Sequence, residues 1–144
     1  MTTIKFFFFL VFSLFLHSIC TAQSPVGTWK TIDDETGQAK SYVDISENNG
    51  KLVGKISRLL LKPADTICDK CRDDKKNKPV LGMVIVDNLF LKDGFYQGGS
   101  ILDPNKGDYY KCSLWLDAGD KNVLNVKGKH WTGLSRTQKW YRVQ

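Results

Sequence analysis

The chain has 144 residues, a formal net charge of +6 and four cysteines. This length suits one domain with a single hydrophobic core and is too short for two. The basic balance favours anionic partners such as lipid headgroups or acidic glycans, or it serves only to solvate the surface. No stripe of Arg and Lys alternates with aromatic residues, so we do not expect the protein to bind nucleic acid.

The first 22 residues have the pattern of a secretory signal peptide. A basic start is followed by an apolar run over residues 6–16, and small residues at 20–22 precede the predicted cleavage site. The run is shorter than the roughly 20 apolar residues that span a bilayer, and no second run follows, so we expect no membrane span. Cys20 leaves a lipoprotein signal open, but Ile19 stands where a small residue is expected. We therefore expect an exported protein, periplasmic or secreted, with a single domain over residues 23–144.

Short strand-like runs alternate with turns along the rest of the chain. Asn48-Asn49-Gly50 predicts a two-residue type I′ hairpin turn. Asp103-Pro104-Asn105-Lys106-Gly107 predicts a tight turn, because Pro presets φ and Gly accepts a positive φ. One helical turn is expected near residues 87–91. The predicted strands are residues 28–31, 41–47, 51–58, 82–87, 95–102, 108–116, 122–129 and 135–142.

Eight antiparallel strands in about 120 residues can close into a barrel, which removes every exposed sheet edge. We therefore predict an all-β fold, an eight-stranded antiparallel up-and-down barrel. A barrel of this size is either filled by side chains or holds one small ligand. Which of the two applies decides the function.

Two motifs stand at the ends of the strand-rich region. Gly27 and Trp29 lie on the first predicted strand, and Arg142 ends the last one. This pair of ends resembles lipocalin-type barrels, in which the Trp ring fills the base and a guanidinium stacks across it by a cation–π interaction. The resemblance implies a lipocalin-like or calycin-like fold with a structural plug made of these three residues.

The period-two alternation of the late strands predicts which side chains face inward. Lys111 has to face solvent, so Tyr110 and Leu114 face the interior, and Arg136 and Gln138 share the inward face of the last strand. A buried Arg or Gln needs a partner, which is either an internal network or the polar head of a ligand, unless the group reaches water at a strand end. The candidate ligand-binding residues are Tyr110, Leu114, Arg136 and Gln138.

Cys68 and Cys71 form a Cys-x-x-Cys motif in the charged stretch 62–79. A redox dithiol, half of a zinc site and a local disulfide all fit this spacing. The stretch is not part of a βαβ unit that would activate a thiolate, and zinc would need Cys112 and His130 as its remaining ligands. We therefore expect a Cys68–Cys71 disulfide of the kind common in exported proteins, a buried free thiol at Cys112 and no metal.

The sequence contains few candidate catalytic residues. His130 is the single imidazole after residue 22, and its position at a strand end favours a structural role. No Gly-rich phosphate loop is present, and nothing selects a pair of acids for glycoside hydrolysis. We expect no catalytic residue and no cofactor, and the protein is not expected to be an enzyme.

Five motifs together resemble an exported bacterial family, domain of unknown function 2147, over essentially the whole chain after residue 22. The resemblance implies a periplasmic or secreted lipocalin-like barrel of Gram-negative bacteria, with no established activity and no catalytic residues. Two functions stay open: binding of a small apolar or anionic amphipathic ligand in the cell envelope, or a structural or protein-interaction module with a filled barrel. The sequence indicates no particular protein partner. The motifs are Gly27-x-Trp29, Gly50-Lys51-Leu52-x-Gly54-Lys55-Ile56, Pro79-x-x-Gly82-Met83, Gly98-Gly99-x-Ile101-x-Asp103-Pro104 and Arg136-Thr137-Gln138-x-Trp140-x-Arg142.

Overall fold

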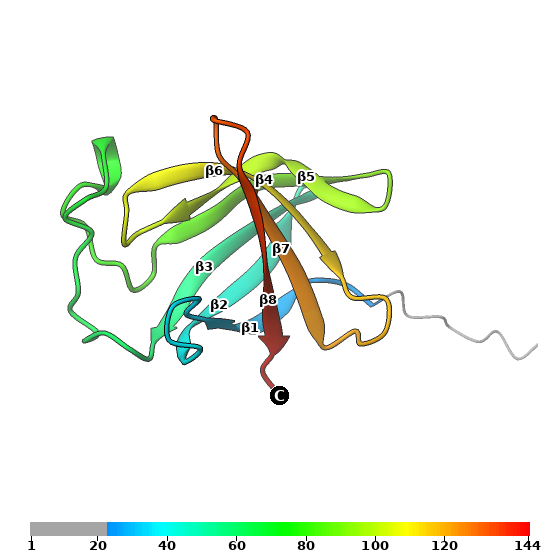
Figure 1. Ribbon diagram of the computed structural model, residues 1–144, viewed down its shortest axis with the longest axis horizontal. Helices are drawn as coiled ribbons and strands as arrows, with labels where there is room; N and C mark the ends of the chain where they lie inside the picture. The colour runs from blue at the N-terminus through cyan, green and yellow to red at the C-terminus, as the bar shows by residue number, and fades with distance from the viewer. Residues whose placement is uncertain (1–22) are drawn as a thin grey trace, which may run out of the picture.

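The computed structural model describes residues 23–144, which form a closed barrel of eight antiparallel strands (Figure 1). Neighbours in the barrel are neighbours in the chain, so the predicted all-β up-and-down barrel is confirmed. The predicted signal peptide lies outside the described residues. Within them, no helix is long and apolar enough to cross a bilayer. The elements are β1 (Gly27–Ile32), β2 (Ala39–Asn48), β3 (Lys51–Leu59), the 3-10 helix η1 (Asp73–Lys75), β4 (Val84–Lys92), β5 (Phe95–Asp103), β6 (Asp108–Leu116), β7 (Val123–Lys129) and β8 (Ser135–Arg142).

The turn residues adopt the backbone conformations that their chemistry favours. Asn49 and Gly50 have φ angles of 51° and 75°, which confirms the predicted turn with both central residues at positive φ. Asp93 and Gly94 repeat this pattern between β4 and β5, with φ angles of 53° and 81°. The turn residues therefore fix the strand register of these two hairpins.

The predicted helical turn at residues 87–91 is wrong, because this stretch is the second half of β4. Asp87 and Asn88 look like turn residues, and Asn88 does have a positive φ of 62°. The strand nevertheless resumes and pairs with β5 up to Lys92. A Cβ on Gly99 would lie 2.0 Å from the carbonyl oxygen of Asp87, so the kinked backbone fits only against a glycine.

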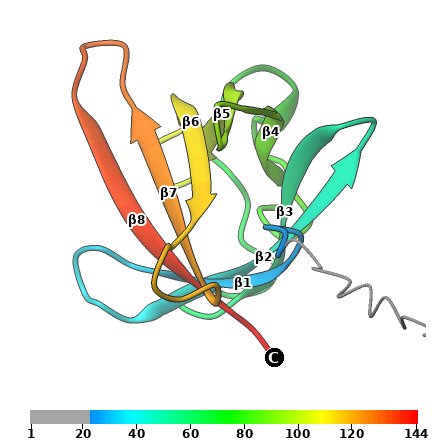
Figure 2. The same cartoon turned by 90° about the vertical axis from the view of Figure 1, so that its right-hand side faces the viewer.

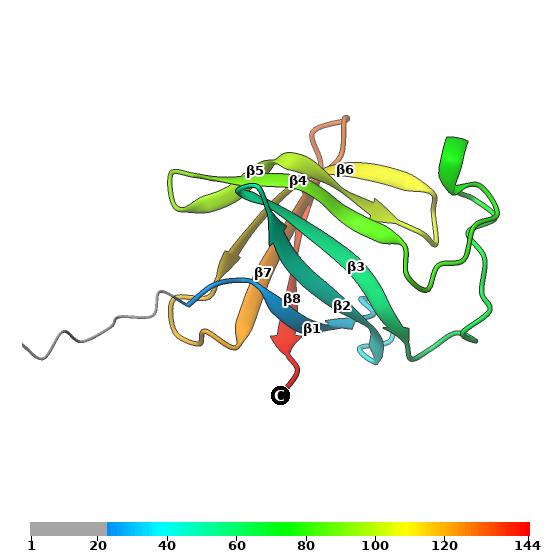
Figure 3. The same ribbon diagram turned by 180° about the vertical axis from the view of Figure 1, so that it is seen from behind.

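Because neighbouring strands run in opposite directions, the turns gather at two ends of the barrel (Figure 1). The plugged end, as we name it, is the end nearer Trp29 and contains the turns 49–50, 93–94 and 117–122. The open end contains the loops 33–38, 60–83, 104–107 and 130–134. Figures 1 and 3 show the long 60–83 segment extending to one side, next to the β5–β6 turn.

The hydrophobic core fills the barrel most completely in its middle and toward the plugged end. One cross-strand row joins Leu116, Leu124 and Trp140, and the row above it joins Leu114, Val126 and Gln138. The side chains with no exposed surface are Trp29, Val43, Leu52, Val86, Leu89, Leu114 and Leu124.

Candidate functional site

Trp29 is enclosed on every side near the base of the barrel. Its side chain has no exposed surface, and the indole Nε1–H donates a hydrogen bond to the carbonyl of Pro25 at 2.8 Å. The guanidinium carbon of Arg142 lies 4.3 Å from the centre of the ring, within the range of a cation–π interaction. The ring therefore has its apolar faces and its polar N–H all in contact with the protein.

Arg142 ties the incoming chain to the last strand. Its Nη1 and Nη2 donate to the carbonyls of Val26 at 3.1 Å and Ser24 at 3.0 Å. Gly27 makes this approach possible, because a Cβ there would lie 2.8 Å from Nη1 of Arg142. Gly27 also has a φ of 138°, which side chains rarely adopt. The structure thus brings Gly27, Trp29 and Arg142 together at one end.

The four candidate ligand residues lie on one inner wall, formed by β6, β7 and β8. Arg136 is directly opposite Gly128, and Gln138 is opposite Val126, which itself faces Leu114. Tyr110 packs against Gly128, where a Cβ would lie 3.3 Å from the tyrosine Cβ. Tyr110 and Ile101 therefore occupy the space that a side chain at Gly128 would take.

Exposure along this inner wall increases toward the open end. Leu114 is fully buried, so it forms part of the floor, and no small molecule reaches it in this conformation. Tyr110, Gln138 and the neighbouring Ile101 are half-buried. The side chain of Arg136 is 62% exposed. The wall therefore changes from apolar and buried to charged and accessible over a few residues.

The polar groups on the wall are joined by a residue that the sequence did not single out. Asp34, from the β1–β2 loop, pairs with Arg136 at 2.8 Å and accepts a hydrogen bond from the Gln138 amide. Gln138 in turn accepts one from Nε1 of Trp140 at 3.3 Å. Asp34 lies in an Asp-Asp-Glu turn, which in sequence resembles any solvated loop. Only the closure of β1 against β8 brings it to this wall.

His130 lies beside Tyr110 at the open end, and Cys112 is buried on β6. The His130 ring lies 5.5 Å from the Tyr110 ring, and its Nδ1 is hydrogen bonded to the Thr132 hydroxyl at 2.9 Å. Cys112 is a buried free thiol, as predicted. Burial raises its pKa to about 12, so the thiol stays protonated and unreactive in the folded barrel.

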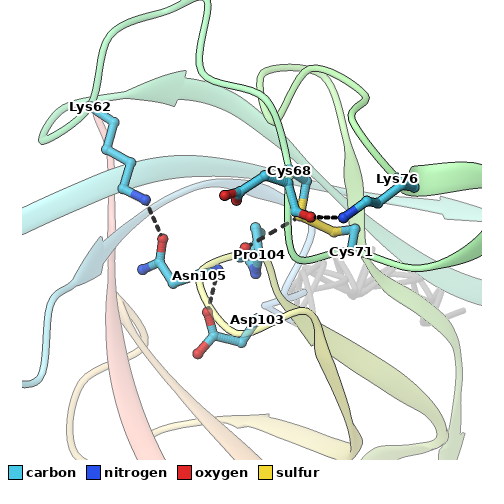
Figure 4. Close-up of a disulfide and its surroundings, with 8 residues drawn as sticks. Lys62, Cys68, Cys71, Lys76, Asp103, Pro104 and Asn105 are labelled. Carbon is cyan, nitrogen blue, oxygen red and sulfur yellow. Dashed lines mark hydrogen bonds between the residues drawn. A yellow bond between two sulfur atoms is a disulfide. The ribbon is translucent and has the colours of Figure 1, made fainter.

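The disulfide between Cys68 and Cys71 is present, which confirms the prediction (Figure 4). Both sulfurs are used in this bond, so neither is a free thiolate that could bind zinc in this state. The bridged loop sits against the β5–β6 turn: Lys62 donates to Asn105 at 2.7 Å. A Cβ on Gly107 would lie 2.0 Å from the carbonyl oxygen of Lys70. The loop is therefore packed closely against the barrel.

This long segment covers the outside of the barrel. Leu102 is 2% exposed, although its neighbour Ile101 faces the interior. Leu102 lies opposite Tyr109, whose ring is 5.9 Å from the ammonium of Lys75 in the long segment. Arg72 adds an ion pair to Asp108 at 3.3 Å. The loop therefore shields an outer apolar patch around Leu102.

Among the hollows of the described residues are two shallow ones, and neither is lined by a residue of the inner wall. Both are open to solvent. One hollow is lined by Gln23, Ser24, Val26, Lys121, Asn122 and Arg142. The other is lined by Asp74, Lys75, Lys78, Pro79, Leu81, Gly82, Met83 and Val84.

Comparison with known proteins places the fold and the family. A solved structure described as "Protein HP1028 from the human pathogen Helicobacter pylori belongs to the lipocalin family" is similar, with a TM-score of 0.71 and 18% sequence identity over 84% of each chain. At this identity the likeness establishes a lipocalin-like fold. No curated protein matches the sequence. The model of the bacterial family described as "Uncharacterized protein conserved in bacteria (DUF2147)" matches residues 27–142, so the chain belongs to this family, as its ordered motifs indicated.

Proposed function

We propose that the protein binds a small amphipathic molecule with an anionic head at the open end of the barrel. The observation that carries this proposal is the change of exposure along the inner wall. Half-buried Ile101 and Tyr110 offer apolar surface above the sealed core, and Arg136 offers a cation beside them. Small-molecule sites commonly combine an apolar lining with a few placed polar groups.

Arg136 has N–H donors available for a ligand. A guanidinium carries five N–H donors, and in the folded chain Asp34 is its one ion-pair partner among the described residues. A carboxylate or phosphate arriving at the mouth can take up the remaining donors in a bidentate pair. The alkyl or ring portion of the ligand then lies over Tyr110 and Ile101.

The cell envelope is the proposed location. The Cys68–Cys71 disulfide suits an oxidising compartment, which supports export. The signal-peptide pattern of the first 22 residues supports the same location.

A pair of detergents with the same tail tests the proposal. Calorimetric titration with laurate, which has an anionic head, should show saturable binding. Dodecyltrimethylammonium, with the same tail length and a cationic head, should bind at least tenfold more weakly. Equal binding of the two, or no binding of laurate, would contradict the proposal.

Variants of the inner wall sharpen this test. Arg136→Gln should weaken laurate binding about tenfold, because charge-assisted hydrogen bonds contribute roughly 1.5–3 kcal/mol. Asp34→Asn should strengthen it, because it removes the carboxylate that competes for Arg136. The matched control is Lys92→Gln, an exposed lysine at the plugged end, which should leave laurate binding unchanged. If Arg136→Gln and Asp34→Asn shifted affinity in the same direction, the wall would have only a structural role.

A second candidate is a filled barrel that acts through its outer surface. It is favoured by the burial of Leu114, Leu124, Val126 and Trp140 across β6, β7 and β8. Native mass spectrometry of protein recovered from its own compartment separates the two functions. A retained small molecule supports ligand binding, and a stoichiometric protein partner with no small molecule supports the filled barrel.

A further inference from the structure

The hairpin end between β7 and β8 presents two apolar side chains to solvent. Trp131 is 87% exposed and Leu134 is 77% exposed. Backbone hydrogen bonds from His130 to Leu134 at 2.7 Å and from Gly133 to His130 at 2.9 Å order the turn that carries them. Figure 2 shows this hairpin projecting clear of the neighbouring loops. We name Trp131 and Leu134 the tip.

The outer surface behind the tip is basic. Lys129 and Lys127 point outward from β7, Lys111 from β6 and Lys139 from β8, and all four are exposed. We name these four residues the lysine face. Asp117, just after β6, accepts a hydrogen bond from the outward Asn125 and lies near Lys139, so the charge of Lys139 is partly balanced. Within the three strands the outward positions include no Asp or Glu: they are Tyr109, Lys111, Ser113, Trp115, Val123, Asn125, Lys127, Lys129, Ser135, Thr137, Lys139 and Tyr141.

The lysine face contains an unfavourable pairing within the sheet. Lys111 and Lys129 are directly opposite each other on neighbouring strands. Like charges in this position destabilise a sheet. Neither of them takes part in an ion pair with a carboxylate among residues 23–144. An anionic surface close to the lysine face would relieve their repulsion.

We propose that the tip and the lysine face dock the protein on an anionic phospholipid bilayer. Trp favours the membrane–water interface, where its ring is apolar and its N–H is wet. Lys129 lies two residues from Trp131, so an inserted tip places this ammonium at the depth of the headgroups. Docking does not depend on whether a ligand binds at the mouth.

The size of the tip favours a membrane over a protein partner. A stable protein interface buries about 800 Å² on each side, around a packed apolar centre. Two side chains at the end of one hairpin, followed by spaced lysines, offer no such centre. A bilayer requires only a shallow apolar wedge together with basic residues near its surface.

Tryptophan fluorescence reports directly on the tip. Trp29 and Trp140 are buried and Trp115 is half-buried, so Trp131 is the exposed member of the four. With vesicles of phosphatidylglycerol mixed with phosphatidylcholine, we expect a blue shift of the emission and quenching by lipids brominated on their acyl chains. Vesicles of phosphatidylcholine alone should produce neither change, and raised salt should reverse both. Trp131→Phe should retain binding and lose the signal.

Co-sedimentation of variants with the same vesicles separates the two parts of the surface. Trp131→Ser combined with Leu134→Ser should weaken binding at least tenfold. Lys127→Gln and Lys129→Gln should each weaken it about fivefold, since each basic residue near an anionic surface contributes a comparable amount.

The control is Leu91→Ser combined with Lys92→Gln. Leu91 is 59% exposed near the plugged end, so this variant should bind like the parent. Residues 6–16 form an apolar run that would itself bind vesicles. All variants are therefore prepared with the same N-terminus, which is verified by mass spectrometry.

Three results would overturn the proposal. They are unchanged Trp131 emission with anionic vesicles, equal binding to neutral vesicles, and an equal loss of binding in the Leu91 and Lys92 control. A protein partner whose binding is abolished by Trp131→Ser, without any vesicle response, would assign the tip to protein recognition instead.

Discussion

Trp29 combines apolar burial, a hydrogen bond and a cation–π contact in one side chain. Its indole N–H reaches Pro25, and the guanidinium of Arg142 lies against its ring. The flanking strands leave no exposed surface on it. A residue with this many partners contributes to stability through packing and leaves no surface free for a ligand.

Trp29→Ala should therefore destabilise the barrel strongly. We expect a loss of about 3–5 kcal/mol in the free energy of unfolding, because a large cavity forms at a site that cannot collapse. Denaturant melts followed by circular dichroism measure this loss. Trp131→Ala is the matched control and should change stability by less than about 0.5 kcal/mol, since that ring is exposed. A loss below about 1 kcal/mol for Trp29→Ala would contradict the role of the ring as a structural plug.

For residues on the inner wall, the sequence predicted the side-chain orientation but not the interaction partners. Alternation along β6 was enough to orient Cys112 and Leu114 inward, and both are buried. Alternation also placed Arg136 and Gln138 on one face, but it could not identify their partner. That partner, Asp34, is 104 positions from Gln138 in the chain, so no local pattern links them.

At the scale of elements, the 60–83 segment is a separate small unit attached to the barrel. It is closed on itself by backbone hydrogen bonds from Cys68 to Lys78 at 2.8 Å and from Val80 to Thr66 at 2.9 Å. The segment packs against Gly107, which has a φ of 72° and no room for a side chain next to the Lys70 carbonyl. Cys-x-x-Cys predicted the bridge, whereas the contact with the β5–β6 turn was invisible in the sequence.

Reduction of the Cys68–Cys71 disulfide should loosen this segment and leave the barrel folded. A bridge that closes only four residues removes little entropy from the unfolded chain, so its loss should cost about 2 kcal/mol. Denaturant melts with and without reductant measure the effect, and limited proteolysis should cut first within residues 60–83. The Cys68→Ala, Cys71→Ala variant is the control, since reductant should not change it. Complete unfolding of the barrel by reductant would contradict this prediction.

At the scale of the whole molecule, the barrel closes through its shortest pairing. β1 and β8 are in register at Trp29 with Arg142 and at Lys30 with Tyr141. One further bond runs from the Val143 N–H to the Thr28 carbonyl at 2.9 Å. By comparison, β7 and β8 pair along the whole of β7. The β1–β8 seam is therefore the place where the closed sheet opens most easily.

Hydrogen exchange should reveal this seam. Amides bonded between β1 and β8 should exchange through a smaller opening free energy than those between β7 and β8. Arg142→Lys should accelerate exchange at the seam about tenfold, because it removes donors to Ser24 and Val26. Arg58→Lys, an exposed arginine beside Tyr42, is the control and should leave the seam unchanged. Uniform protection around the barrel would show that closure does not depend on the seam.

By itself, the sequence determined the strand alternation, the positive-φ turns and the disulfide. Each of these depends on residues a few positions apart, where side-chain type directly limits the backbone. Tertiary structure alone decided that Asp34 meets Arg136, that β4 continues through Asn88, and that the 60–83 segment covers Leu102 from outside. These features depend on which strands become neighbours when the barrel closes, and local residue preferences do not determine contacts across that distance.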